Sequence, residues 1–405
     1  MLAVTEPGVI RLDSSLPGAA WNYAPGKARL WLRCDPETRR AKLITNRARV
    51  VREWRDPLAA LEWMTGHWDD TGPGARWVGY LSYDLGRYFE HLPSRAIDDL
   101  RLPLFCFTLH DSAAPPATLP EAPSTHRAQG LRSNFTRDAY LAAVAHCINY
   151  IAAGDVFQVN LAQRFSVALP ADPASIYANL LRETPAWYGA LLQYPDLALI
   201  CNSPEMFLHV LPQPDGSRTV VTRPIKGTRP KRDGLDRELH DSAKDQAELN
   251  MIVDLERNDL GRVCEIGSVR VTRPREIESH PTVYHGAATI EGRLRSDVGF
   301  VDLLRATFPG GSITGAPKIR AMQIIDELEP HRRGPYCGAI GYLTPGGGME
   351  FNVAIRTMIV KEGLVHVPVG GGIVADSKPA DEYEETLVKA RAMFTALGIA
   401  AEPSS

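Results

Sequence analysis

Val220-Val221-Thr222-Arg223-Pro224-Ile225-Lys226-Gly227-Thr228-Arg229-Pro230 sets one lysine between an apolar run and a Gly-Thr pair. A proline removes one backbone N–H and a glycine permits unusual torsions, so the stretch predicts a strand that ends in a tight turn. A lysine at such a junction, followed by a threonine hydroxyl and exposed N–H groups, can bind a small anionic substrate. A surface lysine in a turn gives the same pattern, and the stretch alone leaves both interpretations open.

Short strands are predicted on both sides of this stretch. At residues 156–165 apolar side chains alternate with Gln158 and Asn160, so the amide face of this strand either borders a polar cavity or meets water. Further strands are predicted at residues 338–344, 349–360 and 364–369. The connections between these last three strands are only a few residues long, which requires antiparallel pairing.

Helical periodicity alternates with these strands. Thr136 can cap one helix, while Pro379 lies in the first turn of another and Gly398 follows its end. The predicted helices cover residues 136–153, 241–258 and 378–397, and one more runs from the glycine-rich segment 308–318 through Leu328. Short-loop strands mixed with helices favour an α+β fold over a doubly wound parallel sheet.

The N-terminal third is separated from the rest by a connector. Residues 113–124 are rich in proline and alanine and poor in bulky apolar residues, which is typical of an exposed segment. Before it, strand-like patterns at residues 28–34 and 77–83 flank a helix-like pattern around residues 58–67. We place the organisational boundary near residue 130.

Composition excludes several classes of partner. The 405 residues carry a formal net charge of −3, which gives no electrostatic reason to expect nucleic acid. No apolar run is long enough to span a membrane, and residues 1–15 lack the basic and apolar segments of a secretory signal. The six scattered cysteines form no C-x-x-C pair, so we expect reduced thiols in a cytoplasmic protein.

Two predicted helices carry acidic pairs at i, i+3 spacing. Asp245 and Glu248 form the first pair, in a stripe that begins at Asp241, and Glu382 and Glu385 form the second. Each pair lies beside an apolar face, so a cation is expected near these half-buried carboxylates. Oxygen ligands without histidine or cysteine suit Mg²⁺. Acids in the first turns of a helix also complement its dipole, and spacing alone does not separate these two roles.

Two glycine-rich segments are candidates for anion binding. Gly370, Gly371 and Gly372 follow a predicted strand, where consecutive glycines let N–H groups point at an anion; a flexible loop is the alternative. The segment 308–318 lacks the G-x-x-x-x-G-K-[ST] spacing of a nucleotide loop, so we do not expect ATP or GTP.

Five motifs in order give the chain a family resemblance. They are Pro224-Ile225-Lys226-Gly227-Thr228, residues 254–263, residues 308–318, residues 370–375 and Glu382-x-x-Glu385-Thr386. Together they resemble the chorismate-utilising enzymes, which include anthranilate, aminodeoxychorismate, isochorismate and salicylate synthases. The resemblance covers about residues 130–397, and residues 79–85 extend it weakly into the first third.

The resemblance implies an α+β fold like that of anthranilate synthase component I, in which antiparallel β-sheets pack together with helices on the outside. It implies a chorismate-binding catalytic region at residues 129–402. The N-terminal region, residues 1–128, is expected to contribute strands to the same body.

Within this family the lysine separates the activities. The motif around Lys226 resembles that of aminodeoxychorismate synthase component I, whereas anthranilate synthases usually carry alanine there. Isochorismate and salicylate synthases carry a water-activating lysine where Gln158 aligns, and an amide cannot act as that base. The expected reaction is therefore amination of chorismate at C4 to give 4-amino-4-deoxychorismate, which leads towards p-aminobenzoate and folate. Anthranilate synthase component I and a non-catalytic chorismate-binding subunit are the alternatives.

The resemblance also implies a role for each matching residue. Lys226 is expected as the nucleophile, Glu205 as the general acid for the departing hydroxyl, and His285 as a residue lining the substrate ring. Mg²⁺ is expected on Glu248 and Glu385, with Asp245 and Glu382 behind them. The expected substrate-binding residues are Gly227, Thr228, Tyr342, Arg356, Gly370, Gly371, Gly372 and Gln158. Ammonia is expected from a separate glutamine amidotransferase subunit, because the chain shows no glutaminase-like cysteine motif.

Overall fold

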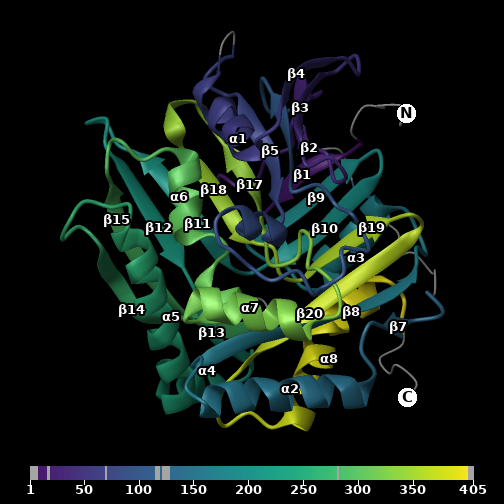
Figure 1. The fold of residues 1–405 in the computed structure, drawn as a ribbon, viewed down its shortest axis with the longest axis vertical. Helices are drawn as coiled ribbons and strands as arrows, with labels where there is room; N and C mark the ends of the chain where they lie inside the picture. Colours follow the sequence, from purple (N-terminus) through teal and green to yellow (C-terminus); the bar gives the residue numbers. More distant parts are fainter. Residues whose placement is uncertain are drawn as a thin grey trace.

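The computed structural model describes residues 8–15, 19–68, 71–114, 119–120, 128–280 and 282–399. Within these residues two β-sheets form the body, with helices around them (Figure 1). All neighbouring strands in these two sheets pair in antiparallel orientation. The predicted α+β class, with antiparallel sheets and outer helices, is confirmed.

The two sheets take strands from different parts of the chain. In strand order, the first sheet contains β1 (Ile10–Asp13), β9 (Tyr188–Tyr194), β10 (Leu197–Ser203), β19 (Thr357–Lys361), β20 (Leu364–Ile373), β8 (Gln158–Ala168) and β16 (Gly315–Ala316), with β7 (Arg132–Ser133) beside β8. The second contains β13 (Ile225–Pro230), β15 (Val283–Leu294), β12 (Arg218–Arg223), β11 (Met206–Pro212), β18 (Met349–Val353), β17 (Ala339–Leu343), β5 (Arg76–Leu81), β6 (Phe105–His110), β2 (Leu30–Cys34), β3 (Ala41–Thr45) and β4 (Val50–Trp54), with β14 (Arg270–Ser279) beside β15.

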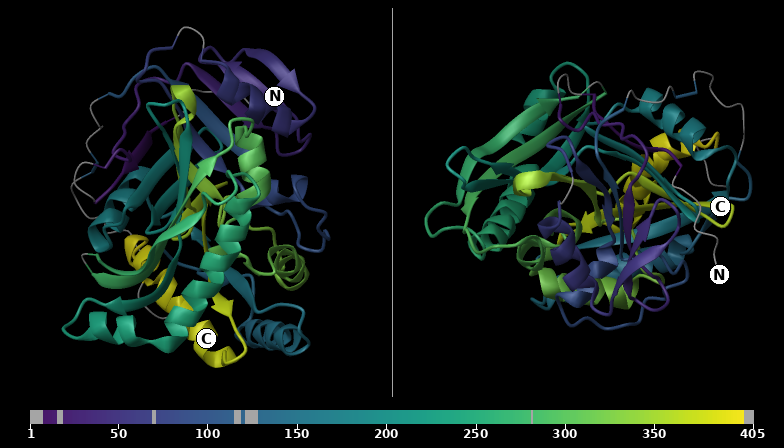
Figure 2. Two further views of the ribbon diagram at one scale, coloured as in Figure 1. Left: turned by 90° about the vertical axis from the view of Figure 1, so that its left-hand side faces the viewer. Right: turned by 90° about the horizontal axis from the view of Figure 1, so that it is seen from above.

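The helices lie mainly around the sheets. They are α1 (Pro57–Gly66), α2 (Arg137–Ala152), α3 (Pro173–Glu183), α4 (Leu235–Asp241), α5 (Ala243–Gly261), α6 (Phe300–Thr307), α7 (Lys318–Leu328) and α8 (Pro379–Ala396), with short 3₁₀ turns at η1 (Tyr83–Tyr88), η2 (Gly311–Ile313) and η3 (Pro345–Gly347). The left view of Figure 2 shows that most of the purple N-terminal strands lie towards the end of the molecule opposite the yellow helix α8.

Three predicted helices are confirmed with their end signals. The Thr136 hydroxyl accepts a hydrogen bond from the Ala139 N–H at 3.2 Å and caps α2. Helix α7 ends at Leu328. Helix α8 begins at Pro379, and Gly398 beyond its end has a φ of 70°, which a glycine adopts at little cost.

The stretch 220–230 differs from its predicted form. Strand β12 ends at Arg223 and β13 begins at Ile225, and both pair with β15, Thr222 opposite Ile290 and Ile225 opposite Ala287. The predicted turn is wrong, because the chain continues through Lys226 as a strand. The register shifts between Ile225 and Thr228, and Gly227 has a φ of 80°. The glycine therefore makes a bulge in β13.

Three further boundaries differ from the predictions. The strand predicted at 349–360 divides into β18 and β19, which belong to different sheets, so Arg356 lies in the crossing between them and not on a strand. Asp241 ends α4, and Ser242 caps the separate helix α5, so Asp241 does not share a helix with Asp245. The glycines 370–372 form part of strand β20 rather than a loop after it.

The N-terminal third contributes to both sheets. Strands β2 to β6 extend the larger sheet, where β5 pairs with β17 through Gly79 opposite Gly341, and β1 pairs with β9 in the smaller one. The predicted segments near residues 28–34, 58–67 and 77–83 correspond to β2, α1 and β5. Residues 115–118 and 121–127, most of the predicted connector, lie outside the described residues.

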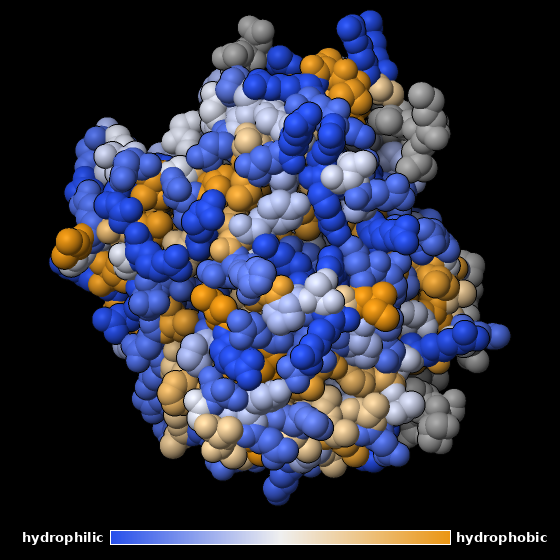
Figure 3. All heavy atoms as spheres, in the orientation of Figure 1, coloured by the Kyte–Doolittle hydropathy of each residue, from blue (hydrophilic) through white to orange (hydrophobic). Residues whose placement is uncertain are grey.

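The visible surface and the cysteines agree with the composition. In Figure 3 the face shown is mostly hydrophilic, with small, separate hydrophobic areas. None of the described helices combines the length and apolarity that crossing a membrane requires. All six cysteines are buried and free, as their scattered positions predicted.

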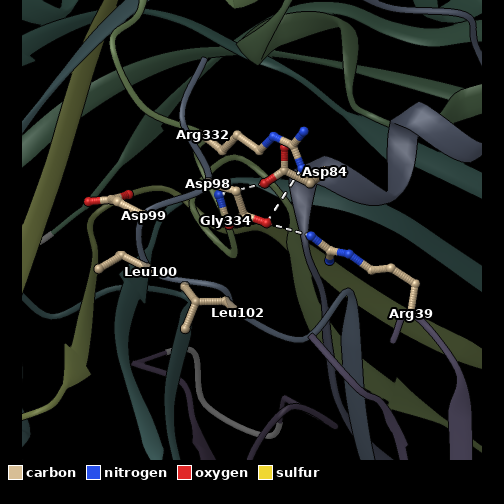
Figure 4. A pocket seen from close by; sticks show the side chains of 8 residues that line it. All are labelled: Arg39, Asp84, Asp98, Asp99, Leu100, Leu102, Arg332 and Gly334. Atoms are coloured by element: carbon tan, nitrogen blue, oxygen red, sulfur yellow. Dashed lines mark hydrogen bonds and ion pairs between the residues drawn. The ribbon is translucent and has the colours of Figure 1, made fainter. Parts of the chain in front are cut away.

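Ion pairs join the N-terminal third to the loop that precedes β17. In Figure 4 Asp84 of η1 accepts a hydrogen bond from the Gly334 N–H at 2.9 Å, and Asp98 pairs with Arg39 and Arg332 at 2.5 and 3.5 Å. Beside this cluster Arg333 binds Glu329 at 2.6 Å, with both side chains at most 4% exposed.

Arg333 extends this network towards the interior. Its guanidinium also donates to the carbonyl oxygens of Ile313 and Asn160, at 2.9 and 2.7 Å. Glu329 in turn accepts the Ala162 N–H at 2.9 Å. The pair therefore connects η2 with the middle of β8, two segments far apart in sequence.

We predict that Arg333→Ala lowers the free energy of unfolding by about 3–5 kcal/mol, because it leaves the buried Glu329 without a counter-ion. Arg95→Ala is the control: Arg95 is 65% exposed and its pair with Glu327 spans 3.5 Å, so its loss should cost less than about 1 kcal/mol. Denaturant unfolding measures both variants, and equal stability of the two would contradict the structural role of Arg333.

Candidate active site

Charged side chains from helices α5 and α8 and from the segment between β10 and β11 converge on Lys226. Burial lowers the pKa of the Lys226 ammonium from its ordinary value, while the nearby carboxylates of Glu248 and Glu205 oppose this shift. Lys389 lowers it further, and Glu385 opposes. No residue that the structure describes forms a hydrogen bond or ion pair with the Lys226 ammonium. An enclosed lysine with these neighbours holds a larger fraction of reactive neutral amine than a surface lysine.

The bulge at Gly227 brings β13 against α4 and α5. A side chain at this position would place its Cβ 2.6 Å from Leu239 Cδ1 and 2.9 Å from Asp245 Cγ. Only glycine fits there, and its positive φ directs the chain past the helix. Asp245 pairs with Arg229 at 3.0 Å, so the strand is tied to α5 on either side of Thr228.

Glu205 and Arg356 lie where the chain crosses between the two sheets. Glu205 connects β10 with β11, and Arg356 connects β18 with β19. The two crossings are hydrogen-bonded to each other, because the Val353 N–H donates to the Glu205 carbonyl at 3.0 Å and the Asn202 N–H donates to the Arg356 carbonyl at 3.1 Å. This pairing fixes a carboxyl and a guanidinium side by side between the sheets.

The Glu205 carboxyl has the properties of a proton donor. It is 4% exposed, and burial raises its pKa to about 7, against the opposing effects of Ser312, Lys226 and Arg356. Its Oε1 atom has no hydrogen-bond partner among the described residues. A carboxyl that titrates near neutral pH suits general acid catalysis.

His285 is held in its neutral form beside these groups. Its Nδ1 lies 2.8 Å from the Thr228 hydroxyl, and its Nε2 is buried without a partner among the described residues. Burial, together with the charges of Arg356 and His280, lowers the pKa of His285 to about 3. The ring can therefore line a site and exchange hydrogen bonds, but it carries no charge at neutral pH.

The three glycines of β20 form the opposite wall. Strand β19 pairs with β20 only as far as His366, so alternate N–H groups of the glycines have no strand partner on that side. A Cβ on Gly371 would lie 3.2 Å from Glu382 Oε2 and 3.6 Å from Glu385 Oε1, and one on Gly372 would lie 3.0 Å from Gln158 Nε2. The glycines thus let α8 and Gln158 approach the backbone.

The four predicted metal ligands come from two helices that face the same lysine. Glu248 and Glu385 both act on the pKa of Lys226, and Lys244 of α5 acts on those of Glu382 and Glu385 of α8. Glu385 pairs with Lys389 at 2.6 Å, and Glu382 accepts the Ser377 hydroxyl at the same distance. Among the described residues no group of three or more acid, histidine or cysteine side chains is close enough to hold a metal by itself. An ion at this place would need oxygen atoms from substrate or water, which Mg²⁺ commonly takes.

Tyr342 is the one predicted site residue that lies in a different cluster. Its hydroxyl donates to Glu350 Oε2 at 2.8 Å, and its ring packs against Trp21 and under the guanidinium of Arg76. No contact of the described residues joins it to Lys226 or Glu205. The structure therefore does not bring Tyr342 together with the other predicted residues.

Several residues at the site were not predicted as part of it. Ser312 in η2 lies beside Glu205, and Lys389 pairs with Glu385 and donates to the Gly370 carbonyl at 3.0 Å. Ser312 belongs to the glycine-rich motif 308–318, and Lys389 lies four residues after Glu385, so both positions carried a signal in the sequence. Buried polar atoms without a partner in the described chain include Gln158 Oε1 and Nε2, Asn160 Oδ1, Glu205 Oε1, His285 Nε2 and Ser312 Oγ.

Such a set of unsatisfied groups is unusual in a folded protein, where nearly all buried polar atoms have partners. Arg356 adds a half-buried guanidinium that has no hydrogen bond or ion pair with a described residue. The arrangement offers a guanidinium, an amine, a proton donor and free amide groups to one small ligand. It suits an anion that carries carboxylates.

Comparisons with known proteins agree with this chemistry. The family model described as chorismate binding enzyme matches residues 27–395. Anthranilate synthase component 1 of Thermus thermophilus is 41% identical over 362 residues, which cover 80% of this chain and 77% of that protein. Aminodeoxychorismate synthase component 1 of Klebsiella aerogenes is 42% identical over 342 residues, which cover 77% and 75%. The crystal structure of anthranilate synthase component I from Streptococcus pneumoniae superposes with a TM-score of 0.79 at 28% identity, over 97% of this chain and 94% of that one.

We predict that Gly227→Ala destabilises the protein by about 2–4 kcal/mol, since the new Cβ is strained at positive φ and overlaps Leu239 and Asp245. Gly216→Ala is the control that measures the cost of a positive φ alone, because Gly216 has a φ of 81° but no atom within 4 Å of the new Cβ. This variant should lose about 1 kcal/mol of stability. Denaturant unfolding of the two variants gives the difference, and equal values would show that β13 does not depend on this close approach.

Proposed function

This chain belongs to the family of chorismate-binding enzymes, and from that premise we propose that it is an aminodeoxychorismate synthase component I. The reaction is the Mg²⁺-dependent amination of chorismate at C4 with ammonia, which gives 4-amino-4-deoxychorismate and water. The observation that carries the proposal is Lys226, an enclosed amine with a lowered pKa beside Glu205. A nucleophilic lysine needs this environment.

The substrate carries two carboxylates, and the site has complementary groups for both. Arg356 would bind the carboxylate of the enolpyruvyl group, because a guanidinium matches a planar carboxylate. The ring carboxylate would lie towards the N–H groups of Gly370 to Gly372 and of Gly227, with the Thr228 hydroxyl beside it. His285, neutral and fixed by Thr228, would line the ring.

The chemical steps follow from Lys226 and Glu205. The neutral amine of Lys226 attacks C2 of chorismate, the ring double bonds shift, and the C4–O bond breaks. Glu205 protonates the departing hydroxyl, which leaves as water. Ammonia then attacks C4, the C2–N bond to Lys226 breaks, and the lysine is restored as an amine. The proton that the incoming nitrogen loses balances the proton that Glu205 gave.

Mg²⁺ is part of the proposal, with Glu248 and Glu385 as its ligands and Asp245 and Glu382 behind them. When bound, the ion would neutralise the ring carboxylate and draw electron density as the hydroxyl leaves. The oxygen-only donor set and the convergence of α5 and α8 on Lys226 fit such an ion.

Ammonia requires a source, and a separate glutamine amidotransferase subunit is the proposed one. The relatives are named component 1, which agrees with a second component. Anthranilate synthase component I is the second candidate function, because relatives of both names match this chain at about equal identity. The two candidates differ in product, since anthranilate formation releases pyruvate.

We predict that Glu248→Gln and Glu385→Gln each raise the Mg²⁺ concentration needed for turnover. Loss of a residue that only hydrogen-bonds a metal ligand typically costs about 10–100-fold in metal affinity, and loss of a ligand itself should cost at least as much. Glu384→Gln is the matched control, since Glu384 is exposed on the same helix as Glu385. Activity is measured against Mg²⁺ concentration, and calorimetric titration of Mg²⁺ gives binding without turnover. An unchanged Mg²⁺ dependence in a variant would remove that residue from the metal site.

We predict that Lys226→Ala loses on the order of 10³-fold or more of C4 amination, since ammonia must then attack without the covalent intermediate. Lys226→Arg should fail as well, because a guanidinium stays protonated. Lys231→Ala, an exposed lysine of the same chain, should retain activity. Chromatography with mass detection separates the products formed from chorismate, Mg²⁺ and ammonium. Wild type making mainly anthranilate would favour the second candidate, and a fully active Lys226→Ala would exclude the covalent role.

A further inference from the structure

A second buried carboxyl, Glu256, lies behind Glu205. Helix α5 carries Asp245 and Glu248 near its beginning, and one and two turns further its inward face carries Ile252 and Glu256. Glu256 is 8% exposed, and its Oε2 accepts the Thr222 hydroxyl at 2.9 Å. The reaction steps proposed above do not use this acid.

A small hollow with a mainly apolar lining lies beside Glu256. Its lining includes Thr222, Asp259 and the backbone of Gly310 and Gly311, and it has room for about one water molecule. Asp259 in this hollow is already paired with Lys318 at 2.5 Å. Glu256 is therefore the acid of the hollow that has no cationic partner within ion-pair distance among the described residues.

The loop at η2 connects Glu256 with Glu205. A Cβ on Gly311 would lie 2.8 Å from Leu255 Cδ2 and 3.6 Å from Glu256 Cγ, so the loop packs directly on this turn of α5. The next residue, Ser312, lies beside the Glu205 carboxyl and its buried hydroxyl has no partner in the described chain. The loop thus brings a hydroxyl that can both donate and accept to Glu205, one residue from its contact with Glu256.

We infer that Glu256 acts through Glu205: the two carboxyls share one exchangeable proton by way of Ser312, Glu205 gives that proton to the departing hydroxyl, and the proton that the incoming nitrogen loses restores it to the pair. Glu256 is then a positioning residue that does not touch substrate. The inference rests on the proposed function, because it requires a Glu205 that gives up its proton in turnover. The transfer moves a proton between two carboxyls and needs no further reactant.

The electrostatic surroundings agree with this pair. Burial, and next the charge of Glu205, raise the pKa of Glu256 to about 8, and Asp259 adds to the shift while Lys318 opposes it. Glu205 faces Lys226 and Arg356 on its other side. A proton shared by two coupled acids stays on the pair until the higher of the two pKa values is passed.

The test compares the pH dependence of kcat/KM in wild type and Glu256→Gln. Glutamine keeps an acceptor for Thr222 but cannot hold an exchangeable acid proton. In wild type the fall in kcat/KM on the alkaline side should be centred near pH 8, and in Glu256→Gln near pH 7, where Glu205 alone titrates. We also expect kcat to fall about tenfold, below the 10²–10⁴-fold typical for a direct general acid.

Two variants separate this role from a structural one. Asp254→Asn changes an acid on the exposed face of the same helix, with a side chain 74% exposed, and should leave the profile unchanged. Glu256→Asp keeps a proton-carrying group and should hold the alkaline fall near pH 8 even if its kcat is lower. An unchanged profile in Glu256→Gln, or an equal shift in Asp254→Asn, would overturn the inference.

A second measurement does not depend on the reaction at all. Burial raises the pKa of Glu256 in the folded protein from its ordinary value of 4.5 to about 8. Between these two pH values the folded protein keeps a proton that the unfolded chain has lost. The contribution of Glu256 to the free energy of unfolding is therefore largest below pH 4.5 and decreases as the pH rises towards 8. The unfolding temperature of Glu256→Gln should therefore fall less across this range than that of wild type. In Glu205→Gln the loss should end at a lower pH, because the charge of Glu205 no longer acts on Glu256. If the unfolding temperature of Glu205→Gln still decreases up to pH 8, the two acids are not coupled. This result does not depend on which product the wild type makes.

Discussion

The structure of the site depends on enclosing one lysine among carboxylates between two sheets. An ammonium ion loses its hydration when it is buried, and this cost favours the neutral amine. Three carboxylates raise the pKa of the Lys226 ammonium again, those of Glu205, Glu248 and Glu385, and none of them forms an ion pair with it. The balance leaves the pKa of this amine below its ordinary value. The segments between the sheets and the helices α5 and α8 supply the walls around it.

Those walls exist because the chain passes twice between the sheets at the same place. The crossing at Glu205 and the crossing at Arg356 share backbone hydrogen bonds, so an acid and a guanidinium are fixed without a long loop. The buried pair of Arg333 and Glu329 ties η2 to β8 behind them. The ion pairs of Asp98 with Arg39 and Arg332, shown in Figure 4, lie beside that connection. The N-terminal third thereby supports the loop that lies behind the site.

Local patterns in the sequence predicted the parts of the fold that depend on local interactions. The ends of α2 and α8 followed from Thr136, Pro379 and Gly398, whose backbone preferences act over a single turn. The turn predicted at Gly227 failed because a positive φ serves a bulge as well as a turn, and only the pairing with β15 decides between them. The division of the predicted strand 349–360 likewise depends on which sheet each half joins.

The site was predicted from motifs, and the limits of that prediction are also physical. Lys226, Glu205 and Arg356 lie together although more than a hundred residues separate Lys226 from Arg356, and only the family resemblance linked them. Tyr342 carried a plausible hydroxyl, but Glu350 on the neighbouring strand binds it. The spacing of Glu256 from Ile252 places it on the inward face of α5, but nothing in the sequence assigns it a role. Its role depends on the burial of one helix face and on the packing of η2.

The central claim is that the Lys226 amine bonds to the substrate ring. The most direct measurement is the intact mass of the protein after it is mixed with chorismate and Mg²⁺ in the absence of ammonium and quenched rapidly in acid, followed by peptide mapping. The account predicts a protein species heavier by one chorismate less one water, with the added mass on the peptide that contains Lys226. It would be contradicted if a preparation that is active with ammonium formed no adduct, or carried it on a different residue.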